Sequence, residues 1–345
     1  MKLKKLISLA MVAVLGVATL SGCGGESEAK KTDENKVVVY SPNSEGLRNA
    51  IIPLFEEKTG IKVELQQAGT GELFTKLKGE AADPVADVIW GGSYTTYLGN
   101  KDLFEEYVSP EDSKLPKAYQ NTAGFKTSYV LDGSCIIVNK DLIGDIKIEG
   151  YKDLLNPALK GKIATADPAS SSSAFSHLTN MLLAMGGYED ENAWKYVEDL
   201  FKNIDGKIYG SSSAVYKSVI DGEMVVGLSY EDPVAKVIKD GAKNIEIVYM
   251  NEGTVYLPAG SAIIKNAKHM DNAKKFIDFI ISKEAQDVLG ETTTNRPVLP
   301  DAKTGDFMKP MKDIKVIEED YQYVHDNSNK IRDRYKDIFA KIQSK

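Results

Sequence analysis

The sequence predicts an α/β protein whose chain divides into two lobes. Over residues 37–90, apolar segments of strand length alternate with segments of helical periodicity. This β-α-β-α-β order is typical of a doubly wound parallel sheet. At 345 residues the chain is too long for one ordinary domain and suits two. The composition, 42% hydrophobic and 27% charged, is that of a globular protein.

The first lobe is predicted from three strands and two helices in succession. The strands lie at residues 37–40, 61–65 and 85–90, and the helices at 44–58 and 72–80. The first strand is continuously apolar, as expected of a strand that is buried on both faces. Ser44 suits the N-cap of the first helix and Gly60 its C-terminal end. Pro53 predicts a kink or a later start in that helix.

The second lobe is predicted to begin near residue 129. Residues 129–139 suggest two extended pieces around Asp132 and Gly133. Further strands are expected at 162–165, 224–230 and 245–250, and helices at 172–185, 194–204, 214–220 and 233–239. Residues 260–264 then return the chain to the first lobe, a long amphipathic helix follows at 273–288, and an apolar stripe marks a helix at 331–342.

The N-terminus has the pattern of an export signal. Three lysines precede an apolar stretch of 15 residues, 6–20, which is too short for a transmembrane helix. The stretch ends in Leu20-Ser21-Gly22-Cys23, which resembles a bacterial lipobox, in which the cysteine is lipidated and becomes the first mature residue. We therefore expect a lipoprotein signal peptide at 1–22 and a protein anchored by lipid alone to the outer face of the cytoplasmic membrane.

The predicted domains follow from these segments. Residues 23–36 contain the lipidated Cys23 and a tether rich in Gly, Glu and Lys. Residues 37–130 and 254–310 make up lobe 1, and residues 131–253 make up lobe 2. Residues 311–345 are expected to form helices that pack on the lobes.

Composition and motifs exclude several functional classes. A net charge of −7 and a pI near 5.3 disfavour a nucleic-acid partner. The three histidines lack metal-site spacing, and no cofactor is expected. We find no Ser-His-Asp order and no Gly-x-Ser-x-Gly nucleophile elbow, so we do not expect an enzyme. Cys135 lies in an apolar run, which indicates a buried strand residue.

Several segments in a fixed order resemble one family. They are residues 37–41, 55–63, 86–92, 151–157, 160–168, 221–227 and 259–262. In this order they are similar to the extracellular solute-binding proteins of ABC importers, in the ferric-iron, phosphonate and sugar-phosphate branch of the type II periplasmic binding protein fold. The resemblance implies two doubly wound α/β lobes joined by crossover strands, with a ligand enclosed between them by a hinge motion. The implied partners are an ABC permease and ATPase complex, and we expect a monomer.

Ligands of such sheets lie at the carboxyl ends of strands and at helix N-termini. The serine run before the helix at 172–185 offers hydroxyls and free amides to an anion, aided by the helix dipole. Arg296, one of only four arginines, is a candidate anion clamp. The candidate ligand-binding residues are Ser41, Thr70, Gly71, Gly92, Ser93, Ser171, Ser172, Ser173, Tyr230, Glu231, Thr254 and Arg296.

Tyr230 and Glu231 bear on the identity of the ligand. Iron-binding members of the family carry two adjacent tyrosines here, whereas this chain has one tyrosine followed by two acids. The sequence therefore favours a small phosphorylated or phosphonate organic anion, of the sugar phosphate or aminoalkyl phosphonate type. A ferric-iron importer is the alternative, with phenolates from Tyr94, Tyr216, Tyr230 or Tyr256. An anchored hydrolase is a second alternative.

Overall fold

The computed structural model describes residues 35–205 and 208–344. The predicted signal peptide, Cys23 and nearly all of the predicted tether lie outside the described residues. The described residues belong to one compact unit, and the description below concerns that unit alone. In the described part of the chain, no helix has the length and apolar character needed to cross a membrane.

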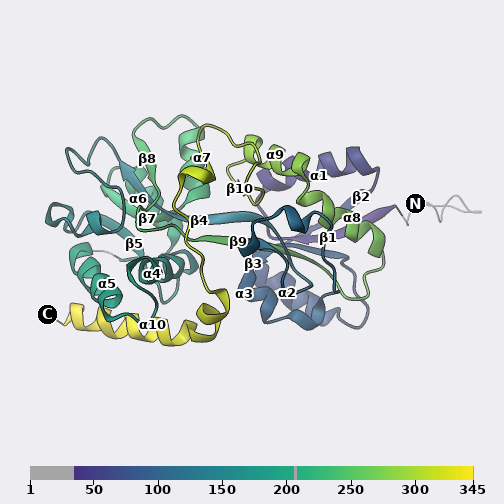
Figure 1. Cartoon of the computed structure of the whole chain (residues 1–345), viewed down its shortest axis with the longest axis horizontal. Helices are drawn as coiled ribbons and strands as arrows, with labels where there is room; N and C mark the ends of the chain where they lie inside the picture. The colour runs from purple at the N-terminus through teal and green to yellow at the C-terminus, as the bar shows by residue number, and fades with distance from the viewer. Residues whose placement is uncertain (1–34, 206–207, 345) are drawn as a thin grey trace, which may run out of the picture. The chain divides into compact units, whose positions relative to one another are not determined.

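The first lobe is a sheet flanked by helices (Figure 1). Its strands are β1 (Lys36–Ser41), β2 (Lys62–Gln67) and β3 (Val88–Ser93), and its helices are α1 (Glu45–Thr59), α2 (Thr70–Gly79), α3 (Tyr94–Leu98), α8 (Met270–Ile280) and α9 (Lys283–Thr292). Strands β1, β2 and β3 pair in parallel, as the sequence predicts. Ser44 and Gly60 cap α1, which starts at Glu45 and contains Pro53 in its interior, so the later start did not occur.

The second lobe repeats this layering. Its strands are β5 (Ile163–Ala166), β6 (Ile208–Tyr209), β7 (Val226–Tyr230) and β8 (Ile245–Val248), and its helices are α4 (Ser172–Met185), α5 (Glu191–Ile204), α6 (Ser212–Ile220) and α7 (Glu231–Lys239). Short 3-10 helices occupy Lys101–Leu103, Asp112–Lys114, Lys117–Tyr119, Lys152–Leu155, Pro157–Leu159 and Met311–Asp313.

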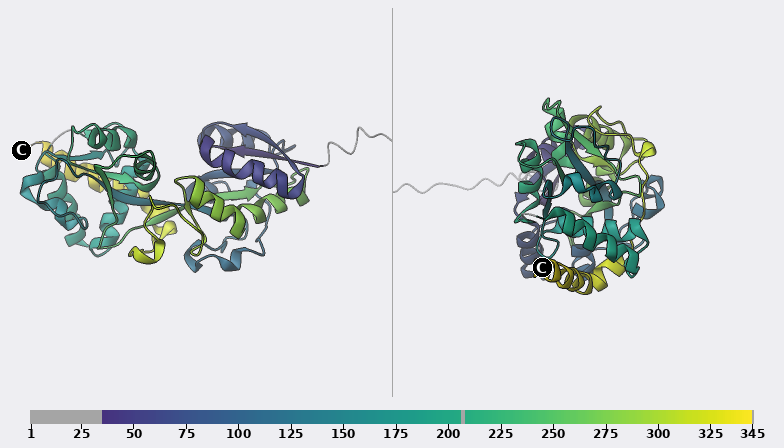
Figure 2. Two further views of the ribbon diagram at one scale, coloured as in Figure 1. Left: turned by 90° about the horizontal axis from the view of Figure 1, so that it is seen from above. Right: turned by 90° about the vertical axis from the view of Figure 1, so that its left-hand side faces the viewer.

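Two long strands join the lobes, β4 (Thr127–Asn139) and β9 (Tyr256–Ile263). Among the described strands the order is β2-β1-β3-β9-β4-β7-β5-β6, with β8 and β10 (Arg296–Pro297) also paired to β4. The first half of β4 pairs with β9 and its second half pairs with β7 and β8. Figure 2 shows these strands running between the two groups of elements. The protein therefore has the predicted architecture of two α/β lobes joined by crossover strands.

Three predicted elements differ from the structure. The helix expected at 331–342 begins ten residues earlier, at Tyr321. Residues 129–139 are one continuous strand, because Gly133 is not a turn residue. It allows close packing, and a Cβ atom at Gly133 would lie 2.3 Å from the Tyr256 ring. The single helix expected at 273–288 is two helices, α8 and α9. Ser282 begins the second one, where its hydroxyl accepts a hydrogen bond from the Ala285 amide at 3.3 Å.

Each lobe has its own apolar core. In lobe 1, Phe276 of α8 packs edge-on against Phe55 at 5.1 Å and against Trp90 at 5.4 Å between ring centroids. In lobe 2, Phe201 of α5 packs against Tyr335 of the C-terminal helix α10 (Tyr321–Gln343) at 5.1 Å. Each such ring, fully buried, contributes about 1.5–3 kcal/mol to stability. Helix α10 thereby packs against α5 (Figure 1).

Candidate ligand-binding site

A cavity of about 740 Å³ is lined by both lobes and by α10. Lobe 1 contributes the turn from β3 into α3, and lobe 2 contributes the first residues of α4 and α6 and the last residue of β7. The residues that line it are Gly92, Ser93, Tyr94, Thr95, Asp132, Ser171, Ser172, Ser173, Phe175, Ser176, Thr179, Ser212, Tyr230, Leu257, Pro258, Ala259, Glu319, Tyr321, Val324, His325, Ser328 and Arg332.

Two serine-rich helix starts form one wall of the cavity. The first turns of α4 and α6 contain no acidic residue. Ser171 caps α4 by accepting a hydrogen bond from the Ala174 amide at 3.3 Å, and Ser211 caps α6 through the Ala214 amide at 3.3 Å. The other amides of a first helical turn have no acceptor within the helix. With the positive end of the helix dipole, these amides and hydroxyls suit an anion.

His177 of α4 fixes the position of this helix through hydrogen bonds to two residues outside it. This side chain is buried and lies between the Tyr151 hydroxyl, 3.0 Å away, and the carbonyl of Ser229 on β7. Burial lowers the pKa of His177 to about 4, so the ring is neutral near pH 7. His177 therefore supports the start of α4 and does not line the cavity.

Arg332 places a positive charge beside the start of α4. Its guanidinium lies 3.7 Å from the centroid of the Phe175 ring and donates a hydrogen bond to the Pro168 carbonyl. Phe175 belongs to the first turns of α4. Burial lowers the pKa of Arg332 from its ordinary value, although Asp167 acts in the opposite direction. Because an arginine stays charged even with such a shift, this wall of the cavity has a cation as well as free amides.

Two carboxyl groups also line the cavity. Asp132 on β4 is exposed to the cavity, yet the surrounding protein and the carboxylates of Asp232 and Glu231 raise its pKa to about 7. Glu319 is 9% exposed, and burial raises its pKa to about 7, although the Thr179 hydroxyl acts to lower it. Among the described residues the Oε1 atom of Glu319 has no hydrogen-bond partner.

Aromatic side chains cover the remaining wall. Tyr94 of α3 stacks on Tyr321 of α10 with 5.1 Å between ring centroids. The ammonium group of Lys126 lies 3.9 Å from the Tyr94 ring centroid. Tyr230 lies on the cavity wall, where burial, followed by the Asp132 carboxylate, raises its pKa to about 12. In the described part of the chain, no group of three or more His, Cys, Asp or Glu residues is arranged to hold a metal ion.

The structure brings half of the predicted binding residues to the cavity. Gly92 takes a backbone conformation with φ of +107°, which places the turn against Thr70, and a Cβ atom there would lie 3.1 Å from the Thr70 methyl group. Thr70 therefore supports the turn without lining the cavity. The predicted residues that line it are Gly92, Ser93, Ser171, Ser172, Ser173 and Tyr230.

The other predicted residues lie elsewhere. Ser41 is buried and donates a hydrogen bond to the Trp90 carbonyl at 2.7 Å. Thr254 is buried and accepts a hydrogen bond from the Met250 amide at 3.2 Å. Gly71 is exposed in the first turn of α2. Ser41 and Thr254 therefore have local structural roles, and Gly71 faces solvent.

Glu231 and Arg296 pair with each other. The Arg296 Nε donates to Glu231 Oε2 at 2.7 Å, a second guanidinium nitrogen donates to Oε1, and the same nitrogen donates to the Lys309 carbonyl at 2.8 Å. Both side chains are 2% exposed. Glu231 also accepts a hydrogen bond from Tyr249. Arg296 is thus placed as a structural partner of Glu231, and the cavity takes its cation from Arg332.

Sequence reasoning missed the contribution of α10. Arg332 was one of four arginines, but nothing in its neighbourhood connects it with residues 171–173, more than 150 positions earlier. Ser212 had a recognisable signal, since 211–213 is a second serine run before a helix. The missed residues that carry polar side chains are Thr95, Asp132, Ser176, Thr179, Ser212, Glu319, Tyr321, His325, Ser328 and Arg332.

Comparisons with known proteins identify the family of the chain. Residues 50–316 match the model of a family described as bacterial extracellular solute-binding protein. The chain belongs to this family. It is a solute-binding component of an ABC importer and not an enzyme, and membership in an extracellular family implies export.

Two relatives of the chain bear iron-related names. It is 26% identical over 313 residues to iron uptake protein A1 of a Synechocystis strain, covering 85% of each chain. It is 26% identical over 341 residues to the Fe(3+)-binding periplasmic protein of Serratia marcescens, covering 96% of this chain and 97% of the relative.

The similar solved structures name a sugar phosphate as well as ferric ion. The periplasmic binding protein AfuA of Actinobacillus pleuropneumoniae, with fructose-6-phosphate bound, has a TM-score of 0.70 and 26% identity, covering 88% of this chain and 98% of AfuA. The apo ferric ion-binding protein A of Pasteurella haemolytica has a TM-score of 0.74 at 22% identity, covering 88% of this chain and 98% of that one, and shows the fold alone.

Proposed function

We propose that the protein captures a small phosphorylated or phosphonate organic anion in this cavity and delivers it to an ABC permease. The observation that carries the proposal is the wall on which the acid-free, serine-rich starts of α4 and α6 meet Arg332. Amides, hydroxyls and a guanidinium are the donors that phosphate groups accept. The likeness to AfuA with fructose-6-phosphate bound supports this ligand class.

Isothermal titration calorimetry tests the proposal. We expect heat of binding from at least one of fructose-6-phosphate, glycerol-3-phosphate and 2-aminoethylphosphonate, and none from the matched compounds without the phosphorus group. Binding of an unphosphorylated sugar as tight as that of its phosphate would contradict the proposal. The absence of binding heat from every compound tested would contradict it as well.

Ferric iron is the second candidate ligand, because relatives bear iron-binding names and because three tyrosines, Tyr94, Tyr230 and Tyr321, line the cavity. Of the four proposed phenolates, Tyr94 and Tyr230 are on the cavity wall, with Asp132 also on it. Tyr216 instead packs against Tyr230, with 6.4 Å between ring centroids, and Tyr256 is buried. A visible tyrosinate-to-iron absorption band after addition of ferric citrate, lost in Tyr230→Phe, would establish this alternative.

We further propose that Cys23 carries a lipid, that the lobes span 37–130 with 254–310 and 131–253, and that the protein is a monomer. The lipobox pattern supports the anchor, and the pairing of β4 with strands of both lobes supports a hinge there.

Mass spectrometry of membrane-extracted protein tests the lipid, with Cys23→Ser as the variant expected in the soluble fraction. Small-angle scattering with and without ligand tests closure and oligomeric state.

A further inference from the structure

The C-terminal segment reaches the cavity from outside the part of the chain that matches the family model. That match ends at residue 316, and six residues beyond it line the cavity: Glu319, Tyr321, Val324, His325, Ser328 and Arg332. The family model therefore carries no expectation for the residues that this segment places at the cavity.

The position of Glu319 is fixed on both sides. Before it, the Thr254 amide donates to the Lys315 carbonyl at 2.8 Å and the Ile317 amide donates to the Thr254 carbonyl at 3.0 Å. After it, the Tyr321 hydroxyl donates to the Tyr256 carbonyl at 3.1 Å, and its ring stacks on Tyr94. Glu319 therefore lies on a segment attached to the chain next to β9 and to α3, and its carboxyl group is held at the cavity wall.

Glu319 is a buried residue of the cavity wall whose side-chain oxygens do not all have hydrogen-bond partners among the described residues. It is 9% exposed, and within residues 35–205 and 208–344 its Oε1 atom has no hydrogen-bond partner. A buried acceptor without a partner is costly, and such groups need a specific explanation. A ligand group that donates hydrogen bonds would supply the missing partner.

The charges around the cavity indicate which kind of ligand group donates hydrogen bonds to Glu319. Asp132 and Glu319 provide two carboxyl groups, whereas Arg332 provides a guanidinium cation and is the one Lys or Arg among the described residues that line the cavity. The Arg332 guanidinium already donates to Pro168 and stands next to the serine-rich helix starts. A ligand that carries only negative charge would satisfy the helix-start wall and be repelled by the two acids. A ligand with an ammonium group at its other end would satisfy both.

We propose that Glu319 is a specificity-determining residue that pairs with an ammonium group of the ligand, so that the substrate class is a zwitterionic aminoalkyl phosphonate or amino-bearing phosphate ester. The phosphorus group lies at the starts of α4 and α6, and this inference rests on the proposed function. The raised pKa of Glu319, which burial causes first, agrees with it, since an ammonium group beside the carboxyl group would stabilise its charged form.

Calorimetry with two matched phosphonates tests the inference. 2-Aminoethylphosphonate and 2-hydroxyethylphosphonate differ in the amino group alone, and at about pH 8 we expect the wild-type protein to prefer the amine by about tenfold or more, as charge-assisted hydrogen bonds allow. In Glu319→Gln the preference should fall to about one, because the amide retains the shape and loses the charge. The matched control is Glu318→Gln, an exposed neighbour that does not line the cavity, which should keep the wild-type preference.

The outcomes separate the two proposals. If fructose-6-phosphate or the hydroxyl compound binds as tightly as the amine, the inference is overturned and the proposed function stands. If no phosphorus compound binds, the proposed function fails, and binding of ethanolamine or putrescine alone would assign the cavity to amines. The wild-type comparison needs no variant, so it decides the question even if Glu319→Gln does not fold. An unchanged preference in a folded Glu319→Gln protein would also overturn the role of this residue.

Discussion

Two adjacent residues at the start of α7 face different polar environments. Tyr230 lies on the cavity wall, while Glu231 turns into the buried cluster with Arg296 and Tyr249. In the buried cluster both oxygens of Glu231 have protein partners. In the cavity, Glu319 keeps an oxygen without one among the described residues. Both glutamates are acidic, yet their hydrogen bonds differ, and so do the roles that we infer for them. The buried cluster, in which Glu231 is fully hydrogen-bonded, holds the chain together. Glu319 has an oxygen that can accept a hydrogen bond from a ligand.

The satisfied cluster also joins the lobes. Glu231 and Asp232 belong to α7 of lobe 2, while Arg296 and its neighbours follow α9 of lobe 1. Next to the ion pair, the Thr294 hydroxyl donates to Asp232 at 2.6 Å. The guanidinium lies 5.2 Å from the Tyr256 ring centroid on β9. Burial and Glu231 raise the pKa of Tyr249 well above its ordinary value, so it remains a hydrogen-bond donor.

The largest expected effect comes from breaking this cluster. Arg296→Met leaves the Glu231 carboxylate buried without its cation, and we expect a loss of about 3–5 kcal/mol in the free energy of unfolding. Urea denaturation of the ligand-free protein measures it. The control is Arg334→Met, which removes a partly exposed arginine paired with Glu191, where the expected loss is under about 1 kcal/mol. Equal losses in the two variants would show that the buried cluster does not hold the lobes together.

The next effect concerns the pH dependence of stability at Glu319. Its folded-state pKa is about 7, above the ordinary value near 4.5, so the folded protein holds this proton more tightly than the unfolded chain. The stability linked to this proton is present below about pH 4.5 and is lost as the pH rises to about 7. The full loss is on the order of 3 kcal/mol.

Glu319→Gln removes this titration. Without ligand, the melting temperature of the variant should rise relative to wild type by a few degrees between about pH 5 and about pH 8. Glu318→Gln serves as the control, with an expected difference near zero. A difference between Glu319→Gln and wild type that does not change with pH would mean that Glu319 is charged throughout this range and paired in the folded state.

A smaller effect is expected at the cationic wall. Arg332→Met keeps contact with Phe175 and loses the guanidinium beside the start of α4. We expect phosphonate binding to weaken about tenfold, or about 1.4 kcal/mol, with salt reducing the difference. Calorimetry at two salt concentrations measures this. Arg334→Met is the control, and unchanged affinity in Arg332→Met would remove this residue from the proposed site.

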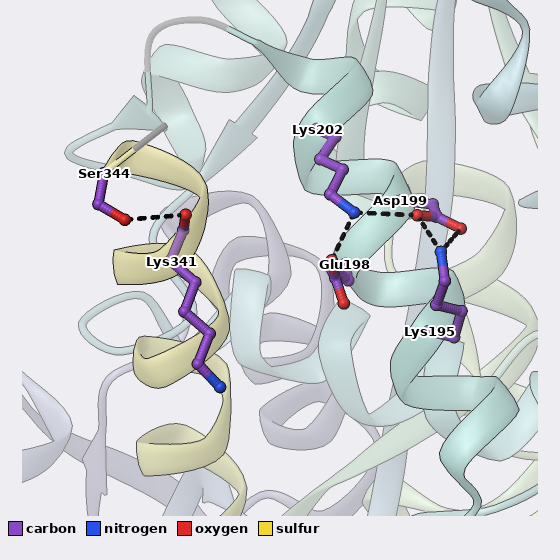
Figure 3. A network of polar contacts seen from close by, with 6 residues as sticks. All are labelled: Lys195, Glu198, Asp199, Lys202, Lys341 and Ser344. Atoms are coloured by element: carbon purple, nitrogen blue, oxygen red, sulfur yellow. Dashed lines mark hydrogen bonds and ion pairs between the residues drawn. The ribbon is translucent and has the colours of Figure 1, made fainter.

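The smallest effect is expected on the outer surface of α5. Figure 3 shows Lys195, Glu198, Asp199 and Lys202 in a network of ion pairs along this helix. These groups are largely solvated, so Lys195→Ala should change stability by less than about 0.5 kcal/mol. Thermal denaturation measures it. A loss as large as that from Arg296→Met would contradict the distinction between buried and exposed charges.

The sequence predicted the elements whose signals are local. Apolar runs located β1 and β3, and the caps Ser44 and Gly60 fixed both ends of α1. The serine run at 171–173 could be recognised as a helix start for the same reason, since a helix start is a local property, and it lies on the cavity wall. Gly133 was misread as a break because its requirement comes from the Tyr256 ring, a residue more than a hundred positions away.

The sequence by itself determined the α/β class, the family and the helix starts, because strand periodicity, caps and ordered motifs act over a few residues. The tertiary structure alone decided which charges meet. It paired Arg296 with Glu231, and it brought Arg332 and Glu319 from the C-terminal segment to a cavity formed mainly by earlier residues. A charge becomes structural or functional according to its partners and its burial, and both depend on contacts between distant parts of the chain.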